Sequence, residues 1–569
     1  MDRPFLRLGS GPLHHQRVHH SRTISVFLNQ FPLLCGHVVF KRGKLMHSAE
    51  KRSWSEAFGA FIHPRVITML FMGLSAGIPI LLIFSTLSIW LREAGVDRST
   101  VTYFSWAALG YSFKFVWAPL IDRLPFPVLH GILGRRRSWL IIAQGCIIGA
   151  ILWMGLTDPA QNLTMMAFAA VALGFASATQ DIVIDAYRIE AADTDLQAMM
   201  SSAYIGGYRV GMIVAGAGAL TIAGLFEAEG SYQPFAWTMA YGCMALAMCI
   251  GVITTLLIRE PAVNRTDSKY FHETSDYVRF LAMFAVTVIA FILANLYAGD
   301  ITDPLKAILH DGGMISELAG FIAGTLKLAI SIAVAILVAW LTTRVGLTPT
   351  GMVRETYIAP VKDFIDRYGK AAIIILILIG VYRIADIVMG VMANVFYTDL
   401  GFSKEEIAAV SKTFGLFMTI AGSFMGGVLS VRYGVVRILF VGALLSAITN
   451  ILFAFMAHMG ANTIMFAVVI MADNLSGGLA TAAFIAYLSG LTNISFTAMQ
   501  YAIFSSIMTL FPKILAGFSG TVVDAVGYSW FFIGTAIIGI PVLYLVVLAG
   551  RLTDVENPNK DRTPAKAEG

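Results

Sequence analysis

The sequence predicts an all-α integral membrane protein. Hydrophobic residues make up 57% of the 569 residues, charged residues make up only 13%, and long apolar blocks recur along the chain. A soluble domain normally has about a quarter of its residues charged, because its surface faces water. The composition therefore excludes a large soluble enzyme. The net charge is only +5, and the basic residues are clustered between apolar blocks. Both features argue against a nucleic-acid partner and for a lipid bilayer.

The apolar blocks predict about fourteen transmembrane helices, because a helix needs roughly 20 residues to cross the hydrocarbon of a membrane. These blocks cover residues 65–91, 100–121, 138–156, 163–187, 198–225, 235–258, 279–297, 319–341, 372–396, 406–430, 437–457, 463–489, 498–525 and 529–550. An even number of spans places both ends of the chain on the same side of the membrane.

Lysine and arginine residues predict which side that is, since short loops rich in them stay in the cytoplasm. The loops after the second, sixth, eighth and tenth spans hold most of these residues: Arg123, Arg135, Arg136 and Arg137; Arg259, Arg265, Lys269 and Arg279; Arg344, Arg354, Lys362, Arg367 and Lys370; Arg432 and Arg437. We therefore expect a multi-pass protein with both termini in the cytoplasm.

The longest basic stretches divide the spans into groups of six, two and six. We expect a flexible, basic and His-rich N-terminal extension at 1–50, a six-helix bundle at 51–260, a cytoplasmic linker with an inserted transmembrane hairpin at 261–370, a second six-helix bundle at 371–552 and a cytoplasmic tail at 553–569. A protein that starts at Met46 is the alternative to the long extension. Short matches three hundred residues apart indicate that the bundles are repeats: Ala186-Tyr187 and Ala198-Met199, against Ala486-Tyr487 and Ala498-Met499.

The loop after the second span of each bundle resembles the major facilitator loop motif, Gly-x-x-x-Asp-Arg-x-Gly-Arg-Arg. The first copy supplies Asp122, Arg123, Arg135 and Arg136, with extra residues in its middle; the second keeps Arg432 but has valine in place of the acidic residue. Acidic and arginine side chains in such a loop can pair across the bundle interface and stabilise one of two rocking states. We predict that these five residues form a conformational switch; the alternative is a basic loop that only fixes topology.

Charged residues cluster within the fourth span. Asp181, Asp185 and Arg188 are spaced i, i+4 and i+7, so one helical face presents all three. Because two carboxylates one turn apart repel each other in a low dielectric, at least one of them is a candidate for carrying a proton. The alternative is a structural pair in which Arg188 neutralises Asp185. Asp386 is a third candidate for proton coupling, although Arg383 lies three residues away and can pair with it.

Further polar side chains lie at membrane depth, where an ionised group usually faces a partner or a water-filled cavity. At this depth the lysine and arginine side chains outnumber the carboxylates of the same helices, which suits a substrate that bears carboxylates. Tyrosine and amide side chains suit the hydroxyl groups of a sugar. The predicted substrate-binding residues are Tyr111, Lys114, Gln180, Tyr208, Arg209, Arg383, Lys412 and Asn474.

Several of these segments resemble the AmpG-type muropeptide permeases of the major facilitator superfamily. The resemblance covers residues 55–550 apart from the hairpin, and rests on an ordered set of short matches: Gly110-Tyr111-Ser112-Phe113-Lys114, Ser177-Ala178-Thr179-Gln180-Asp181, Gly207-Tyr208-Arg209, Lys412-Thr413-Phe414-Gly415 and Asn474-Leu475-Ser476-Gly477. The His-rich start and the hairpin between the halves depart from the family pattern.

The resemblance implies a major facilitator fold and a secondary active transporter. It implies import of anhydro-muropeptides, which are sugar-peptide fragments of the cell wall, from periplasm to cytoplasm across the cell inner membrane. It further implies proton symport by alternating access, with the proton gradient as energy source, no cofactor, and a monomer as the working unit.

Other functions remain open at this point. A drug or metabolite antiporter and an acetyl-CoA-type carrier belong to the same superfamily. A membrane-embedded enzyme would need a catalytic motif, and neither His-Glu-x-x-His nor a phosphate-binding glycine loop occurs. The four cysteines lack the paired spacing of metal ligands, so we expect neither a zinc site nor disulfides.

Overall fold

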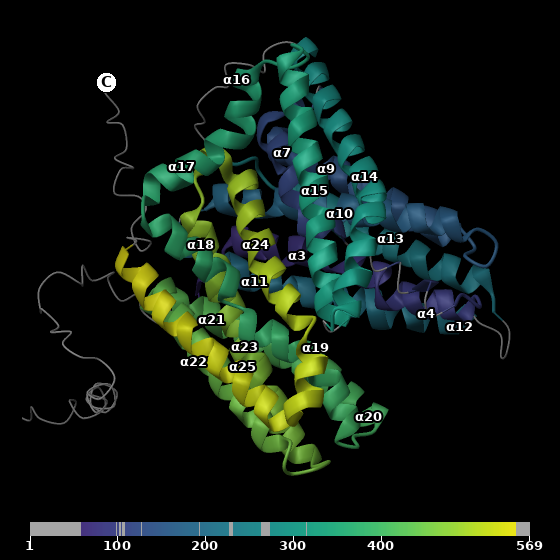
Figure 1. Ribbon diagram of the computed structural model, residues 1–569, viewed down its shortest axis with the longest axis vertical. Helices are drawn as coiled ribbons and strands as arrows, with labels where there is room; N and C mark the ends of the chain where they lie inside the picture. Colours follow the sequence, from purple (N-terminus) through teal and green to yellow (C-terminus); the bar gives the residue numbers. More distant parts are fainter. Residues whose placement is uncertain are drawn as a thin grey trace, which may run out of the picture. The chain divides into compact units, whose positions relative to one another are not determined.

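The fold is built from helices throughout the part of the chain that the structure describes (Figure 1). This computed structural model describes residues 59–97, 100–101, 104, 109–126, 128–192, 194–226, 232–262, 274–313 and 316–552. The predicted N-terminal extension at 1–50 and tail at 553–569 lie outside these residues. The all-α prediction is confirmed.

Thirteen helices in the described ranges are long and apolar enough to cross a membrane, and they coincide with thirteen of the fourteen predicted spans. The exception is the predicted span 100–121. There the described residues form three short helices, α6 (Leu109–Phe113), η3 (Lys114–Val116) and α7 (Ala118–Arg123). Pro119 contributes to the interruption, because proline has no backbone N–H and fits the first turn of a new helix, here α7.

We call helices α3 to α13 the first half of the protein. Its remaining elements are η1 (Ala60–Ile62), α3 (Pro64–Ile83), α4 (Ser85–Glu93), α8 (Leu129–Leu133), α9 (Arg135–Gly155), α10 (Leu163–Ala191), α11 (Thr194–Ile213), η4 (Val214–Gly218), α12 (Ala219–Phe226) and α13 (Pro234–Leu257).

Helices α18 to α25 form the second half. Its elements are α18 (Ala371–Val381), α19 (Ile384–Asp399), α20 (Lys404–Glu406), η6 (Ile407–Phe414), α21 (Gly415–Tyr433), α22 (Val435–Met456), α23 (Thr463–Leu491), η7 (Ile494–Phe496), α24 (Thr497–Ala516) and α25 (Ser519–Leu552). The short segments η4 and η6 are π-helical, with one more residue per turn than the α-helices that they continue.

Matching helices of the two halves begin in the same way, which supports the predicted repeat. Gly134 precedes α9 with φ 84° and Gly434 precedes α22 with φ 89°, a left-handed conformation that glycine adopts without strain. Asn162 and Asn462 cap α10 and α23 through side-chain oxygens that accept the backbone N–H three residues on. These pairs of residues are three hundred positions apart, as the sequence matches are.

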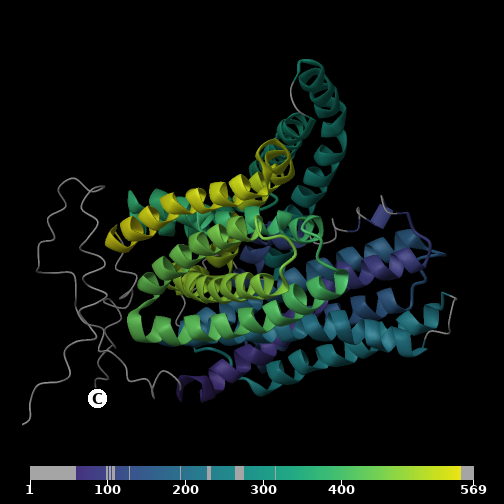
Figure 2. The same ribbon diagram turned by 90° about the horizontal axis from the view of Figure 1, so that it is seen from below.

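The helices between the halves are α14 (Thr274–Asp311), α15 (Ser316–Arg344), α16 (Thr350–Val353), η5 (Arg354–Ile358) and α17 (Ala359–Tyr368). The long helices α14 and α15 form the predicted hairpin and pack mainly against each other (Figure 2). At the base of the hairpin, Phe280 is buried and stacks on Tyr357 of η5, and the Thr348 hydroxyl donates to the carbonyl of Arg279. The predicted hairpin between two sets of helices is thus present in the described residues.

Close backbone packing of α3 against α11 positions part of the site described below. A Cβ at Gly77 would lie 2.0 Å from the carbonyl oxygen of Tyr208, and a Cβ at Gly207 would lie 1.9 Å from that of Leu70. Small residues allow two membrane helices to approach this closely. The contact therefore fixes the part of α11 that carries Tyr208 and Arg209.

Candidate functional site

A buried charged cluster occupies the first half, on η3 and α10. Asp185 forms ion pairs with two cations, with Lys114 Nζ at 3.6 Å and Arg188 Nη2 at 3.2 Å. Asp181 lies one turn away and accepts a hydrogen bond of 3.3 Å from the Tyr204 hydroxyl. Two carboxylates and two cations balance, which makes the burial of all four charges tolerable. The predicted common face of Asp181, Asp185 and Arg188 is thus present, and η3 adds Lys114 to it.

The cluster extends to tyrosines and to the second half. The Tyr111 hydroxyl donates to Ser177 Oγ at 2.5 Å, on the same helix as Asp181. Arg188 donates to Ser489 Oγ of α23 at 2.5 Å, and its guanidinium lies 5.1 Å from the ring centre of Tyr501 on α24. The charges of α10 therefore lie where the two halves meet.

Arg209 contributes a positive charge that no acidic residue balances among the described residues. Its guanidinium is half-buried, and its one hydrogen bond within the described ranges is a 3.8 Å contact with the sulfur of Met212. It lies beside the Tyr208 hydroxyl and close enough to Arg383 of the second half for the two cations to repel each other. Two arginines from different halves that lie near enough to interact electrostatically create a region that attracts anions.

The second half holds its own polar cluster beside Arg383. Arg383 Nε lies 3.5 Å from Asp386 Oδ2, and the Ser446 hydroxyl donates to the other oxygen of Asp386. Asp473 of α23 accepts from the Thr449 hydroxyl at 3.3 Å and interacts electrostatically with Asp386 and Arg383. The predicted intrahelical pair of Arg383 and Asp386 is therefore present, within a larger group.

Three predicted substrate-binding residues have partners of their own. Gln180 is fully buried inside the first half, where its amide bonds with the Ser75 hydroxyl of α3, so the structure does not bring it to the charged cluster. Lys412 donates to Asn394 at 2.8 Å. Asn474 accepts from Thr419 at 2.7 Å and donates to a backbone carbonyl of its own helix.

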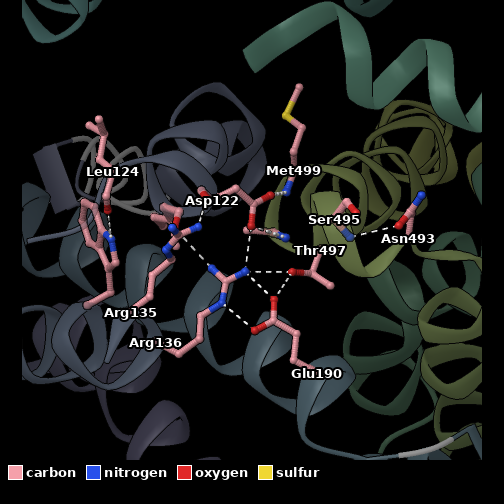
Figure 3. A network of polar contacts seen from close by, with 12 residues as sticks. Asp122, Leu124, Arg135, Arg136, Glu190, Asn493, Ser495, Thr497 and Met499 are labelled. Atoms are coloured by element: carbon pink, nitrogen blue, oxygen red, sulfur yellow. Dashed lines mark hydrogen bonds and ion pairs between the residues drawn. The ribbon is translucent and has the colours of Figure 1, made fainter. Parts of the chain in front are cut away.

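Asp122 and Arg136 form the centre of a network that joins the halves (Figure 3). Arg136 donates to Asp122 at 2.7 Å, to Glu190 at 2.6 and 3.0 Å, and to the Thr497 hydroxyl at 2.8 Å. Asp122 also accepts the backbone N–H groups of Ala498 and Met499, at 3.1 and 2.9 Å. Its carboxylate thus caps the N-terminus of α24, where the helix dipole favours a negative charge.

The other predicted switch residues differ in their partners. Arg135 donates to the carbonyl of Asp122 at 2.6 Å and so supports the same loop. Arg123 Nη1 lies 3.1 Å from Glu355 of η5 and its guanidinium lies over the ring of Phe496. Arg432 lies over the ring of its neighbour Tyr433. The first copy of the loop therefore reaches the second half through Asp122, Arg123 and Arg136.

The helix α17 adds contacts at the same end. Asp363 accepts from the side chains of Asn493 and Gln500, and Arg367 donates to Gln500 at 3.0 Å and to the carbonyl of Leu491. The hydrogen bonds and ion pairs between the halves gather here, at the end that bears the basic loops. The structure is closed at this end.

A family model described as Major Facilitator Superfamily matches residues 113–359 and 366–568, which is most of the chain. The chain belongs to the Major Facilitator Superfamily. Among curated relatives of this superfamily, "Putative transporter AmpG 4" of Rickettsia felis is 27% identical over 491 residues, covering 86% of this chain and 98% of the relative. The anhydromuropeptide permease of Escherichia coli strain K12 is 27% identical over 506 residues, covering 89% of this chain and 84% of the relative. The resemblance to AmpG-type permeases is thereby confirmed.

Solved structures of the superfamily share the fold at low sequence identity. The proton:xylose symporter XylE bound to 6-bromo-6-deoxy-D-glucose superposes with a TM-score of 0.52 at 13% identity, covering 88% of this chain and 95% of that one. The transporter FucP in the outward conformation superposes with a TM-score of 0.51 at 11% identity, covering 86% of this chain and 99% of that one. The protein is a multi-pass membrane transporter of this superfamily and not an enzyme.

Glu190 and Thr497 are site residues that the sequence analysis missed. Glu190 lies in the last turn of α10, where the negative end of the helix dipole disfavours a carboxylate. A carboxylate at that position indicates that a cation lies nearby, and this cation is Arg136. Thr497 carries no comparable signal, because a hydroxyl at a helix start is common.

Proposed function

We propose that the protein imports anhydro-muropeptides, which are sugar-peptide fragments of the cell wall, from periplasm to cytoplasm across the cell inner membrane. Both termini lie in the cytoplasm, and the working unit is a monomer that needs no cofactor besides the proton gradient. The names of the curated relatives support the substrate class. The two halves rock about the charged cluster between them and expose it to one side at a time.

The observation that carries this proposal is Arg209, a cation that no acidic residue balances among the described residues and that lies near enough to Arg383 of the second half to interact with it electrostatically. A muropeptide bears carboxylates, and a carboxylate between two guanidinium groups relieves their repulsion while gaining charge-assisted hydrogen bonds. The hydroxyls of Tyr111 and Tyr208 lie in the same region and suit the hydroxyls of a sugar. The site thus selects for an anion that also carries polar groups.

In this proposal we assign proton coupling to Asp181. Asp185 already pairs with both Lys114 and Arg188, whereas Asp181 accepts its hydrogen bond from the neutral Tyr204 hydroxyl. A proton on Asp181 leaves the cluster one charge more positive, which favours binding of the substrate carboxylate. Each inward charge gains about 2.3 kcal/mol per 100 mV of membrane potential.

Replacing Arg209 by glutamine is expected to weaken substrate binding on the order of 10- to 100-fold, because one charge-assisted hydrogen bond contributes about 1.5–3 kcal/mol. The measurement is uptake of labelled anhydro-muropeptide into proteoliposomes with an imposed pH gradient. Arg209→Lys should retain part of the affinity, since it keeps the charge. The control is Arg92→Gln, an exposed arginine that donates to the carbonyl of Val96. Equal uptake by both glutamine variants, or export instead of import, would contradict the proposal.

Replacing Asp181 by asparagine is expected to abolish uptake driven by the pH gradient while leaving exchange of labelled for unlabelled substrate intact. The reason is that exchange needs reorientation of the loaded carrier but no net proton transfer. Both fluxes are measured in the same vesicles, with Asp158→Asn as control, because Asp158 bonds with Tyr232 outside the cluster. Gradient-driven accumulation that survives in Asp181→Asn removes this assignment.

A further inference from the structure

The linker segment, which we define as η5, α17 and the two residues that follow (354–370), has two different faces. Toward the protein, Phe364 is buried and its ring contacts that of Phe504 on α24. The other side of the helix carries Ile358, Val361 and Ile365, spaced i, i+3 and i+7, with exposed fractions of 55%, 42% and 49%. We call these three residues the apolar stripe. An exposed apolar surface of this kind marks contact with a membrane or with another partner.

Positive charges adjoin the apolar stripe. Arg354 lies four residues before Ile358 and Lys362 four residues after it, and Lys370 follows the helix. All three are exposed, and their side chains form no ion pair or hydrogen bond with a described residue. Asp366 is the exposed acidic residue of the linker segment, so three positive charges against one negative leave a charge of +2. An apolar stripe with basic residues beside it is typical of a helix that lies on an anionic membrane surface.

The neighbouring spans place the linker segment at the membrane surface. Helix α15 ends at Arg344, whose guanidinium lies 4.8 Å from the ring centre of the half-exposed Trp340. Tryptophan and arginine together are typical of the boundary between hydrocarbon and water. At the other end, Gly369 and Lys370 alone separate α17 from α18, which begins a candidate membrane span at Ala371. Lipid is therefore the partner that the apolar stripe meets.

The opposite face of the linker segment is bonded to both halves. Glu355 Oε1 lies 3.1 Å from Arg123 Nη1, and the Tyr357 hydroxyl donates at 3.3 Å to the carbonyl of Val116, both in the first half. Asp363 accepts from two side chains of the second half, as described above. A ligand on the exposed face therefore acts on a segment that joins the halves at their closed end.

We infer that the linker segment is a binding site for anionic phospholipids, and that lipid bound there stabilises the state closed at this end. The lipid phosphates pair with the three exposed cations, and the acyl chains cover the apolar stripe. The bound lipid holds the linker segment where its other face bonds with both halves. A ligand that binds one of two states more tightly shifts the balance toward that state.

The test is the thermal stability of the purified full-length protein in detergent, without substrate, during titration with phosphatidylglycerol or phosphatidylcholine. Phosphatidylglycerol should raise the Tm, and phosphatidylcholine should not. The triple variant Arg354→Gln, Lys362→Gln and Lys370→Gln should bind phosphatidylglycerol on the order of 100-fold more weakly, because each cation near an anionic surface contributes about fivefold in affinity. The control neutralises three exposed arginines outside the linker segment and should keep the parent affinity: Arg92→Gln, Arg437→Gln and Arg551→Gln.

The effect of lipid on the closed end is measured in nanodiscs as the distance between spin labels at Gly131→Cys and Ser495→Cys, in a background without the four native cysteines. Adding phosphatidylglycerol to phosphatidylcholine nanodiscs should enlarge the population with the short distance in the parent protein and in the control. The triple variant should show no such change.

Soluble glycerol phosphate carries the anionic headgroup without acyl chains and should not raise the Tm, because it cannot cover the apolar stripe. An equal response to glycerol phosphate, equal responses of the parent protein to the two lipids, or parent affinity in the triple variant each overturns the inference. So does self-association that Ile365→Ser abolishes, since the apolar stripe would then be an interface between copies of the chain. No muropeptide is present in these assays, so a failure of the proposed substrate is seen separately, as absent uptake.

Discussion

Replacing Arg136 by glutamine is expected to open the closed end of the protein. The variant leaves Asp122 and Glu190 buried beside each other without the guanidinium that now bonds with both. Breaking a buried ion pair in this way is unfavourable by about 3–5 kcal/mol, which shifts the balance between the two rocking states by more than about a hundredfold. The rate of transport should also fall, because the carrier can no longer return to the state that is closed at this end.

The opening can be measured as the distance between spin labels at Gly131→Cys and Ser495→Cys, on opposite halves, in a background without the four native cysteines. Arg137→Gln is the matched control, since Arg137 donates to carbonyls of Thr255 and Leu256 within its own half. The control should keep the parent distance. If Arg136→Gln also keeps it, the network does not hold this end closed.

Replacing Gly207 by valine is expected to prevent folding. A Cβ there would lie 1.9 Å from the carbonyl oxygen of Leu70, so α3 and α11 must separate, which should destabilise the protein by more than about 3 kcal/mol. The loss of folded protein is read by size-exclusion chromatography and by the Tm in detergent. Gly149→Val on α9 is the matched control, because nothing lies within 4 Å of its Cβ position. Similar behaviour of the two variants would show that the close packing of α3 and α11 is not needed.

Much of the fold was predictable because its signals are local. Lengths of apolar blocks and the positions of basic loops identify spans and their grouping, and helical spacing identifies the shared face of Asp181, Asp185 and Arg188. The span at 100–121 was predicted as one helix, whereas its described part is three short ones, because composition alone does not reveal that Lys114 turns toward Asp185.

The site was harder to predict, since spacing gives a face of a helix but not its neighbour. Gln180 is next to Asp181 in sequence, yet one faces α3 and the other faces Tyr204 of α11. Likewise the loop motif pointed to Asp122, but its partners Ala498 and Met499 are more than 370 residues away in sequence. Such pairs depend on how two halves dock, which no local pattern encodes.

Two of the three π-helical segments in the described residues lie on helices that pack against each other across the halves, η4 continuing α11 and η6 leading into α21. Both are placed toward the ends of those helices that are remote from Asp122 and Arg136. An extra residue in a helical turn weakens its hydrogen bonding and lets the turn tighten or shift along the chain. We therefore expect α11 and α21 to bend at these two turns when the halves move relative to each other.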